Sequence, residues 1–292
     1  MISAGAASPA ASIWRCGSHT FDLSRRPCIM GILNLTPDSF SDGSSYASAE
    51  QAVAAAEKMV RDGADLIDIG GESTRPGAPP VSVDEELRRV MPVIEALSGR
   101  IGVPLSIDTW KAEVARVSLA AGVAVVNDIS GMEFDAGMAE TVAATDAGIV
   151  LMHTRGKPAE MQQATSYSDL VGEVSDYLRH CMARAALAGI GAERIVLDPG
   201  IGFGKSVAGN LEIIRRLAEF AILGRPLLVG PSRKSFIGTT LGRGVDDRLF
   251  GTAAAVAVSL LNGARIFRVH DVRQMRDVVD MVAAITAGDD AV

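Results

Sequence analysis

The chain has 292 residues, of which 48% are hydrophobic and 22% charged, and its 28 basic and 35 acidic residues give a formal net charge of −7. This composition is that of a folded globular protein and excludes extended disorder. The net acidity argues against bulk nucleic-acid binding and against a basic membrane-surface role. Three cysteines without a C-x-x-C pair predict reduced thiols and a cytoplasmic location.

The first 20 residues lack the basic and apolar segments of a signal peptide, and we expect them to form a flexible extension of one domain that spans 21–292. Within this region, residues 13–23 are expected to form a short hairpin that covers one end of the domain. The longest apolar stretch, 253–261, is shorter than the roughly 20 residues that a membrane-spanning helix needs.

From about residue 27 onward, short apolar runs alternate with amphipathic stretches of helical period. The predicted strands span 28–35, 65–69, 104–107, 124–127, 148–152, 194–197, 226–229 and 264–269. The predicted helices begin near residues 48, 83, 111, 137, 169, 209 and 249, and an eighth spans 272–286. Eight such units predict a single (β/α)₈ (TIM) barrel, whose strands read as apolar because both faces are buried. The alternative is an open doubly wound sheet, which usually has fewer strands.

Polar side chains follow the predicted strands, where barrel enzymes carry their chemistry. Asp108, Asn127 and Asp198 follow the third, fourth and sixth strands, and their acceptors suit a flat heterocycle that presents several N–H donors. Three side chains that are expected to form the cationic side of the site follow the last two strands, where this fold commonly binds phosphate: Lys234, Arg268 and His270. Three residues near the first strand offer hard oxygen ligands for Mg²⁺: Asn34, Asp38 and Asp42. Together these residues predict a site for a heterocycle that bears a diphosphate.

Other polar residues in the same loops have simpler interpretations. His153 is expected to orient a loop, and Asp128 and Asp271 are expected to be structural. The segment 202–206 (GFGKS) lacks the G-x-x-x-x-G-K-[ST] spacing of a nucleotide-binding loop, so we do not assign it that role.

Seven segments resemble the dihydropteroate synthases of folate biosynthesis: 30–43 (MGILNLTPDSFSDG), 63–78 (GADLIDIGGESTRPGA), 106–115 (SIDTWKAEVA), 126–131 (VNDISG), 198–206 (DPGIGFGKS), 230–238 (GPSRKSFIG) and 268–272 (RVHDV). The resemblance runs from about residue 21 to near the C-terminus. It implies an enzyme that joins 6-hydroxymethyl-7,8-dihydropterin diphosphate to 4-aminobenzoate and releases pyrophosphate. Ser44 and Thr154 depart from the family pattern, and neither changes a charge that the chemistry needs.

The resemblance also implies a role for each matching position. The pterin ring would be held by Asp108, Asn127, Asp198, Lys234 and Phe203. The diphosphate would be held by Asn34, Thr74, Arg75, Arg268 and His270, with Mg²⁺ at Asn34. Two loops, 36–46 and 72–80, would close over the site, and the 4-aminobenzoate pocket would include Phe40, Thr74, Pro76, Lys234 and Ser235. Catalysis would rest on Lys234, Arg268, His270, Asp198 and a carboxylate of the first loop, Asp38 or Asp42.

Two other functions are compatible with part of this pattern. A barrel that transfers a methyl group from methyltetrahydrofolate to a corrinoid protein would share Asp108, Asn127 and Asp198 but would not need the cationic residues. A catalytically silent relative would bind the pterin without turning it over. The stretch 249–262 is apolar almost all round. Either the terminal helix and the long helix over 169–188 cover it, or, as the family resemblance implies, this region forms a homodimer interface.

Overall fold

The computed structural model describes residues 12–36, 48–75 and 77–287, and its centre is a closed parallel barrel with the strand order β10-β3-β4-β5-β6-β7-β8-β9. The barrel strands are β3 (Cys28–Asn34), β4 (Leu66–Gly70), β5 (Leu105–Asp108), β6 (Val125–Asp128), β7 (Gly148–Met152), β8 (Ile195–Asp198), β9 (Leu227–Val229) and β10 (Ala264–Val269). Each strand agrees with its predicted range to within one residue at either end. The predicted (β/α)₈ barrel is therefore confirmed.

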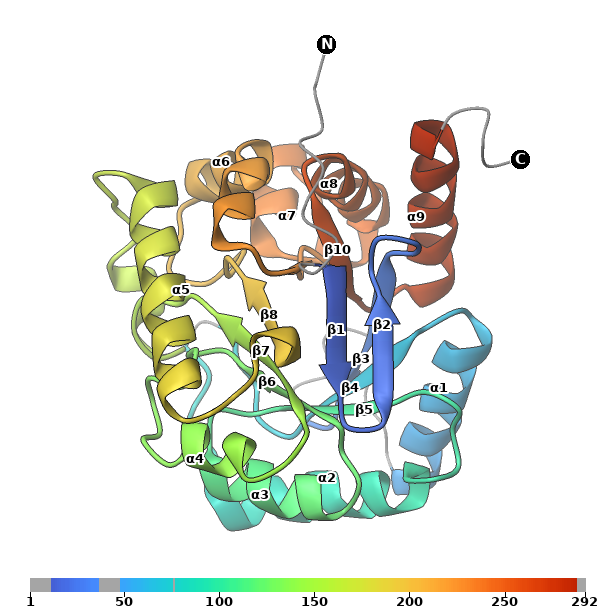
Figure 1. Ribbon diagram of the computed structural model, residues 1–292. Helices are drawn as coiled ribbons and strands as arrows, with labels where there is room; N and C mark the ends of the chain where they lie inside the picture. Colours follow the sequence, from blue (N-terminus) through green and yellow to red (C-terminus); the bar gives the residue numbers. More distant parts are fainter. Residues whose placement is uncertain (1–11, 37–47, 76, 288–292) are drawn as a thin grey trace.

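Helices surround the barrel (Figure 1). They are α1 (Ala49–Arg61), α2 (Val83–Leu97), α3 (Ala112–Ala120), α4 (Met138–Ala143), α5 (Leu170–Leu187), α6 (Val207–Arg215), α7 (Ser235–Leu241), α8 (Leu249–Leu261) and α9 (Val272–Ala287). Short 3₁₀ turns lie at η3 (Met161–Gln163), η4 (Ala192–Arg194), η5 (Leu217–Leu223) and η6 (Val245–Asp247). The seven-residue helix α7 is an addition to the predicted series and lies between β9 and α8.

Several helices begin at a side chain that accepts a hydrogen bond from the first turn. Ser48, Ser82, Asp169 and Ser206 are the N-caps of α1, α2, α5 and α6, and each accepts from the backbone N–H three residues later. Such caps satisfy donors that a helix leaves unpaired at its start. The loops that precede these helices are thereby fixed at their C-terminal ends.

The N-terminal hairpin closes one end of the barrel. Strands β1 (Ile13–Cys16) and β2 (His19–Asp22) pair antiparallel, as predicted, and lie across the barrel in Figure 1. Trp14 is fully buried, and its indole N–H donates to the carbonyl of Arg194 at 3.1 Å. The expected boundary at residue 20 falls inside β2, because the indole of Trp14 and the side chain of Leu23 pack into the barrel's own apolar layer.

The interior of the barrel changes from apolar to polar along its axis. The layer beside the hairpin contains Leu66, Val125, Val196 and Ile266. Because side chains alternate along a strand, the residue two positions later points the same way. These later residues are Asp68, Asn127, Asp198 and Arg268. The strands are thus not apolar throughout, and the end of the barrel opposite the hairpin has a polar interior.

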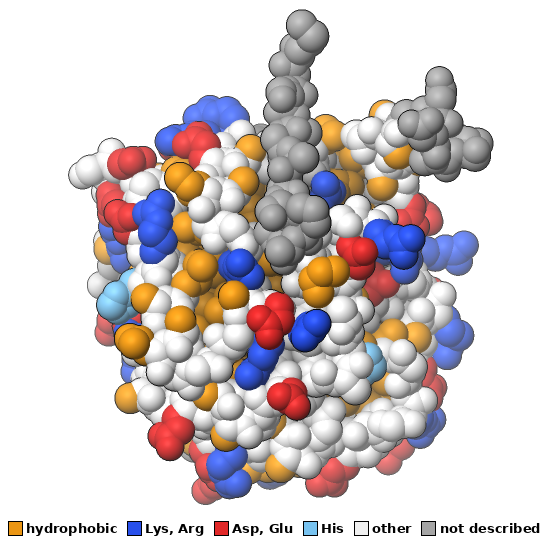
Figure 2. All heavy atoms as spheres, in the orientation of Figure 1, with side chains coloured by type: hydrophobic (Ala, Val, Ile, Leu, Met, Phe, Trp, Pro, Cys, Tyr) orange, Lys and Arg blue, Asp and Glu red, His pale blue; other side chains and the backbone are white. Residues whose placement is uncertain are grey.

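No helix within the described residues is long and apolar enough to cross a membrane. Figure 2 shows the face that carries the hairpin, where acidic and basic side chains are intermixed over the surface. The side chains predicted to form the cationic part of the site, Lys234, Arg268 and His270, line a pocket formed by other segments of the chain.

Candidate active site

A pocket of about 420 Å³ opens at the polar end of the barrel. Its lining includes all five predicted diphosphate-binding residues: Asn34, Thr74, Arg75, Arg268 and His270. Phe203, Lys234 and Ser235 also line it, so three residues predicted for the two organic substrates face the same space. The carboxyl ends of β3 and β10 and the loops after β4, β8 and β9 thus meet at one cavity, as the barrel fold requires.

Arg268 connects this pocket to the acidic interior. Its Nε donates to Oδ2 of Asp68 at 2.6 Å, and its Nη2 donates to Oδ2 of Asp108 at 2.7 Å. Asn127 donates to the same Asp68 oxygen at 3.0 Å, and Ser106 donates to the other at 2.6 Å. Three predicted residues therefore belong to one buried hydrogen-bonded network, with Asp68 at its centre.

Asp68 is a site residue that the sequence analysis missed. It is fully buried and accepts hydrogen bonds from the three neighbours just named. The signal was present in β4, because Asp68 stands in the middle of the run LIDIG instead of after it. A carboxylate inside an otherwise apolar strand needs buried hydrogen-bonding or charged partners, so its position in the run indicates a buried polar network.

Asp108 has an unused acceptor. Its Oδ1 is buried and has no hydrogen-bond partner among the described residues. Burial, opposed by Arg268 and reinforced by Asp68, raises the pKa of Asp108 to about 7. An unpaired buried oxygen costs free energy unless a ligand donates to it. Asp108 is therefore suited to accept from an N–H group of a bound heterocycle.

Asp198 and Lys234 lie on either side of the glycine-rich loop after β8. Asp198 accepts from the Gly200 N–H at 2.7 Å, and burial raises its pKa to about 6. The ammonium of Lys234 lies 4.0 Å from the centre of the Phe203 ring, and burial together with Arg268 lowers its pKa to about 8. Lys234 is thus still mostly cationic at neutral pH, and its charge is close to the pocket.

Two glycines allow this loop to lie so close to its neighbours. At Gly200, which has φ +72°, a Cβ atom would lie 1.9 Å from the backbone oxygen of His153. At Gly202, which has φ +85°, a Cβ atom would lie 2.8 Å from Cδ of Lys234. Any side chain at these positions would displace the loop or the lysine. The GIGFG pattern therefore places Phe203 and Lys234 against each other.

The segment 202–206 does not act as a nucleotide-binding loop, because Lys205 is turned into the protein. Its ammonium donates to the carbonyl oxygens of Gly200 and Phe203, both at 2.9 Å, and lies 2.9 Å from Nδ1 of His153. His153 therefore helps to hold a loop, as expected. Asp128 accepts from Ser130 and Met132, and Asp271 pairs with Arg233, so both carboxylates have the expected structural roles.

His270 differs from the sequence expectation in its charge. Burial and the nearby cations Arg233, Arg268 and Lys234 lower its pKa to about 3, so the imidazole is neutral at pH 7. The hydroxyl of Ser232 accepts from the His270 backbone N–H at 3.2 Å and lies 3.0 Å from Nδ1. A hydroxyl that accepts from the backbone can donate to Nδ1, which leaves the ring proton on Nε2. His270 would then act on a phosphate as a hydrogen-bond donor.

Four predicted residues, Asp38, Phe40, Asp42 and Pro76, lie outside the described residues. The pocket also has basic lining residues that sequence reasoning did not select, Arg233 and Arg248. Arg248 donates to the Arg233 carbonyl at 2.9 Å, which joins the start of α8 to the loop after β9. The charge of Arg233 is paired with Asp271, so Arg248 is the lining residue of these two that adds positive charge beyond the predicted set.

The described residues contain no cluster of three or more His, Cys, Asp or Glu side chains that would hold a metal ion by themselves. Asn34 presents a side-chain amide at the pocket beside Arg268 and His270. One amide oxygen fits Mg²⁺ in a site where substrate phosphate and water supply the other ligands.

Comparison with known proteins places this arrangement among pterin-binding barrels. Residues 30–270 match the family described as pterin binding enzyme. The dihydropteroate synthase of Synechocystis sp. is 47% identical over 270 residues, which cover 92% of this chain and 93% of that protein.

Solved structures agree with this match. The Yersinia pestis dihydropteroate synthase in a sulfonamide drug complex superposes with a TM-score of 0.91 at 43% identity, over 94% of this chain and 100% of that one. The Xanthomonas albilineans dihydropteroate synthase in complex with 7,8-dihydropteroate has a TM-score of 0.83 at 38% identity, over 96% of this chain and 99% of that one. The likeness therefore covers the whole barrel and its pocket.

Proposed function

The chain belongs to the pterin-binding enzyme family, and we propose that it catalyses the dihydropteroate synthase reaction. In this reaction the amine of 4-aminobenzoate displaces diphosphate from 6-hydroxymethyl-7,8-dihydropterin diphosphate, giving 7,8-dihydropteroate and pyrophosphate. One observation carries the assignment. The buried acceptor of Asp108 lies directly behind Arg268, which lines a pocket rich in positive charge. This juxtaposition suits one molecule with an N–H-rich ring and an anionic tail.

The pterin ring is assigned to the acidic interior. Asp108, Asn127 and Asp198 supply acceptors from three strands, and Phe203 with Lys234 forms the adjoining wall. Dihydropterin presents several N–H donors along one edge, and buried carboxylates accept such donors well because little water competes. A methyltransferase-type pterin barrel would use the same acceptors, but it would have no need of the cations that line this pocket.

The displacement breaks the bond between the pterin methylene carbon and a diphosphate oxygen, and the electron pair leaves with that oxygen. The amine nitrogen forms the new bond to carbon and releases one proton to solvent. The positive charges of Lys234 and Arg268 stabilise the negative charge that develops on the leaving group, and neutral His270 donates a hydrogen bond to that group. Asp198 faces the positive charge that develops on the pterin, assisted by a carboxylate of the first loop, Asp38 or Asp42.

The second substrate is assigned to the outer part of the pocket. Thr74, Ser235 and Lys234 line this part, and Phe40 and Pro76 complete the proposed set. Ser235 is exposed at the start of α7, where its hydroxyl can reach a carboxylate in the pocket mouth. The amine attacks in its neutral form, so no strong general base is required.

Asn34 is assigned as the protein ligand of Mg²⁺, because its amide lies at the pocket beside the residues assigned to the diphosphate. When bound, the ion would neutralise part of the charge on the leaving diphosphate. Turnover is expected to stop in excess chelator and to return when Mg²⁺ is restored. Full turnover in excess chelator would remove Mg²⁺ from the proposal.

A homodimer and a cytoplasmic location are proposed on separate grounds. Phe250 on α8 is 85% exposed, and Val258 and Leu261 of the same helix are also exposed, which favours burial of α8 against a second copy. A monomer mass in light scattering would contradict the dimer. All three cysteines are free and buried, which is typical of a reducing compartment.

The decisive experiment measures pyrophosphate release from pterin diphosphate with and without 4-aminobenzoate, after calorimetry has established that the pterin binds. Release that depends on 4-aminobenzoate supports the synthase. Binding without any release would instead identify a silent pterin-binding relative.

A further inference from the structure

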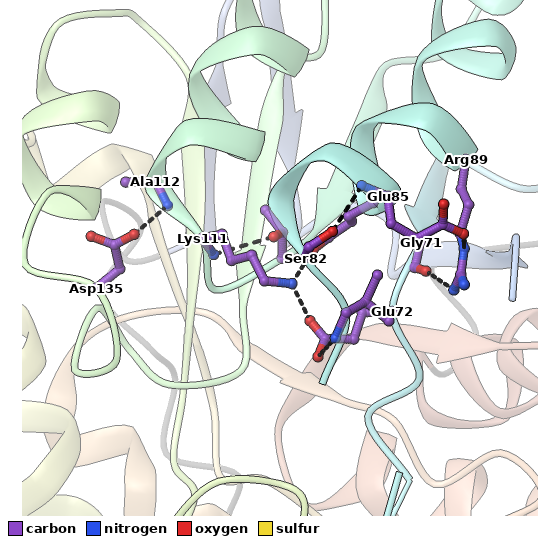
Figure 3. A network of polar contacts seen from close by, with 11 residues as sticks. Gly71, Glu72, Ser82, Glu85, Arg89, Lys111, Ala112 and Asp135 are labelled. Atoms are coloured by element: carbon purple, nitrogen blue, oxygen red, sulfur yellow. Dashed lines mark hydrogen bonds and ion pairs between the residues drawn. The ribbon is translucent and has the colours of Figure 1, made fainter. Parts of the chain in front are cut away.

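Three charged side chains form a buried cluster beside the active-site pocket and outside the acidic network described above. The ammonium of Lys111 pairs with the carboxylates of Glu72 and Glu86 (Figure 3). The Lys111 side chain is 8% exposed and that of Glu86 is fully buried. Glu72 begins the loop after β4, Glu86 lies in α2, and Lys111 precedes α3. The cluster therefore joins two consecutive βα units, β4–α2 and β5–α3.

The second oxygen of Glu72 closes the base of the loop that it begins. Its Oε1 accepts from the backbone N–H of Val81 at 3.1 Å. The Glu72 carboxylate thus connects the two ends of the loop. The residues between them include Thr74 and Arg75, which line the pocket. Lys111 holds the other oxygen of this carboxylate, so the loop base is tied to the rest of the barrel through one ammonium.

Helix α2 fixes the preceding residue as well. Arg89 donates to the Gly71 carbonyl at 2.9 Å, and it also pairs with Glu85 in the same helix at 2.7 Å (Figure 3). A Cβ atom at Gly71 would lie 2.8 Å from Cγ1 of Val90 and 3.0 Å from Cγ of Glu86. Gly71 therefore lies directly against α2, and the loop starts from a position that the helix determines.

A cluster of two carboxylates and one ammonium is a poor way to gain stability alone. Burial raises the pKa of Glu86 above its ordinary value, because the charged form loses water that Lys111 only partly replaces. Buried ion pairs often contribute no more stability than apolar residues of the same volume. Buried ion pairs instead fix geometry, because each charge-assisted hydrogen bond restricts the position of the group that it binds.

We propose that Glu72, Lys111 and Glu86 are positioning residues, which hold the loop of residues 72–75 and 77–81 so that Thr74 and Arg75 face the pocket. The proposal rests on the function proposed above and adds a specific consequence to it. Lys111 lies three residues after Asp108, so the same short segment carries a pterin acceptor and the loop anchor. The loop contributes to both substrates, because Thr74 is assigned to the diphosphate and to 4-aminobenzoate and Arg75 to the diphosphate, whereas the acceptors for the pterin ring lie outside the loop.

The test compares two substitutions of Glu72 with a matched control. Glu72→Ala removes both the Lys111 pair and the acceptor for Val81. Glu72→Gln keeps the size and the acceptor and leaves Lys111 paired one-to-one with Glu86, so the fold is preserved. The control is Glu113→Gln, because Glu113 is an exposed α3 residue that pairs only with Arg116 in the described part of the chain.

The first measurement is hydrogen exchange of the ligand-free proteins, which does not depend on activity. The backbone amides of residues 73–75, 77, 78 and 81 should exchange about tenfold faster in Glu72→Ala than in wild type, with Glu72→Gln between them and Glu113→Gln unchanged. Exchange in this loop that is the same in Glu72→Ala and wild type would overturn the proposal.

The second measurement is steady-state kinetics. The KM for 4-aminobenzoate should rise about tenfold in Glu72→Ala, which corresponds to the loss of one charge-assisted hydrogen bond, while the affinity for 6-hydroxymethyl-7,8-dihydropterin, which lacks the diphosphate, is unchanged in calorimetry. An equal loss of affinity for the diphosphate-free pterin would show a general structural defect and overturn the proposal. Absence of pyrophosphate release from the wild type would instead refute the proposed function, and the exchange data would still decide the anchor.

Discussion

Replacement of Asp68 by asparagine tests whether the buried network around Arg268 is as important as its geometry implies. The carboxamide has the same shape, can accept from Arg268 through its oxygen and can donate to Ser106 through its nitrogen. What disappears is the negative charge next to a guanidinium whose side chain is only 19% exposed. Asp108 remains as the single carboxylate bonded to Arg268.

The expected loss of stability is limited because Asp108 still balances the charge of Arg268 in the variant. Removal of the only partner of a buried charge costs about 3–5 kcal/mol, whereas one hydrogen bond to a charged group contributes about 1.5–3 kcal/mol. Because Asp108 still pairs with Arg268, we expect Asp68→Asn to lower the free energy of unfolding by about 2 kcal/mol. We also expect kcat/KM to fall by about 30-fold. This is the factor that corresponds to about 2 kcal/mol, the free energy with which Asp68 holds the Arg268 guanidinium in its position at the pocket.

The assay is urea unfolding monitored by tryptophan fluorescence, with pyrophosphate release measured on the same preparations. The matched control is Asp176→Asn, because Asp176 is an exposed carboxylate that also pairs with an arginine, Arg179. The control should change the free energy of unfolding by less than about 0.5 kcal/mol. If Asp68→Asn behaved like this control in both assays, the network would have no role in stability or catalysis, and the reasoning would be refuted.

Three further predictions concern the same site. Lys234→Ala and Arg268→Ala should each lower turnover by about 100-fold or more, a loss of at least about 2.7 kcal/mol of transition-state stabilisation; near-normal pyrophosphate release in both would sink the site assignment. Because burial raises the pKa of Asp108 to about 7, this group stabilises the folded state at low pH and loses that contribution as the pH rises from about 4 to 7. Asp108→Asn should therefore gain roughly 1 kcal/mol per pH unit relative to wild type between pH 5 and 7 in urea titrations, and a constant difference would contradict this. A sulfonamide that mimics 4-aminobenzoate should raise the apparent KM for that substrate without lowering the maximal rate; a purely non-competitive pattern would place it elsewhere.

The barrel could be predicted from the sequence because its signals are local. Each strand is a short apolar run such as GIVLM, which appears unchanged as β7, and each is followed by a helical stretch. Helix α7 was missing from the predicted series because its seven residues, SFIGTTL, are too few to establish a helical period. The N-terminal hairpin was predicted from the run 13–23, but its close packing into the barrel depends on Trp14 meeting a surface formed much later in the chain.

The site was predicted where residues follow strands and missed where they lie inside the fold. Asp108 and Asp198 stand at strand ends and were selected on that ground, whereas Asp68 precedes the end of its strand by two residues. The Lys111–Glu86 pair joins residues 25 positions apart on different elements, and no local pattern distinguishes it from ordinary surface charges. The neutral state of His270 follows from burial among cations, which only the folded arrangement establishes.

The hairpin at the closed end of the barrel has a consequence for the order of events during turnover. Trp14 and Leu23 fill that end, and the pocket lies at the opposite end of the described barrel. Under the proposed function, a ligand at Asp108 would therefore have to enter before one at Ser235 and could not leave while that second ligand remained. We therefore expect ordered binding and release, to which residues 13–23 contribute from the far end of the barrel.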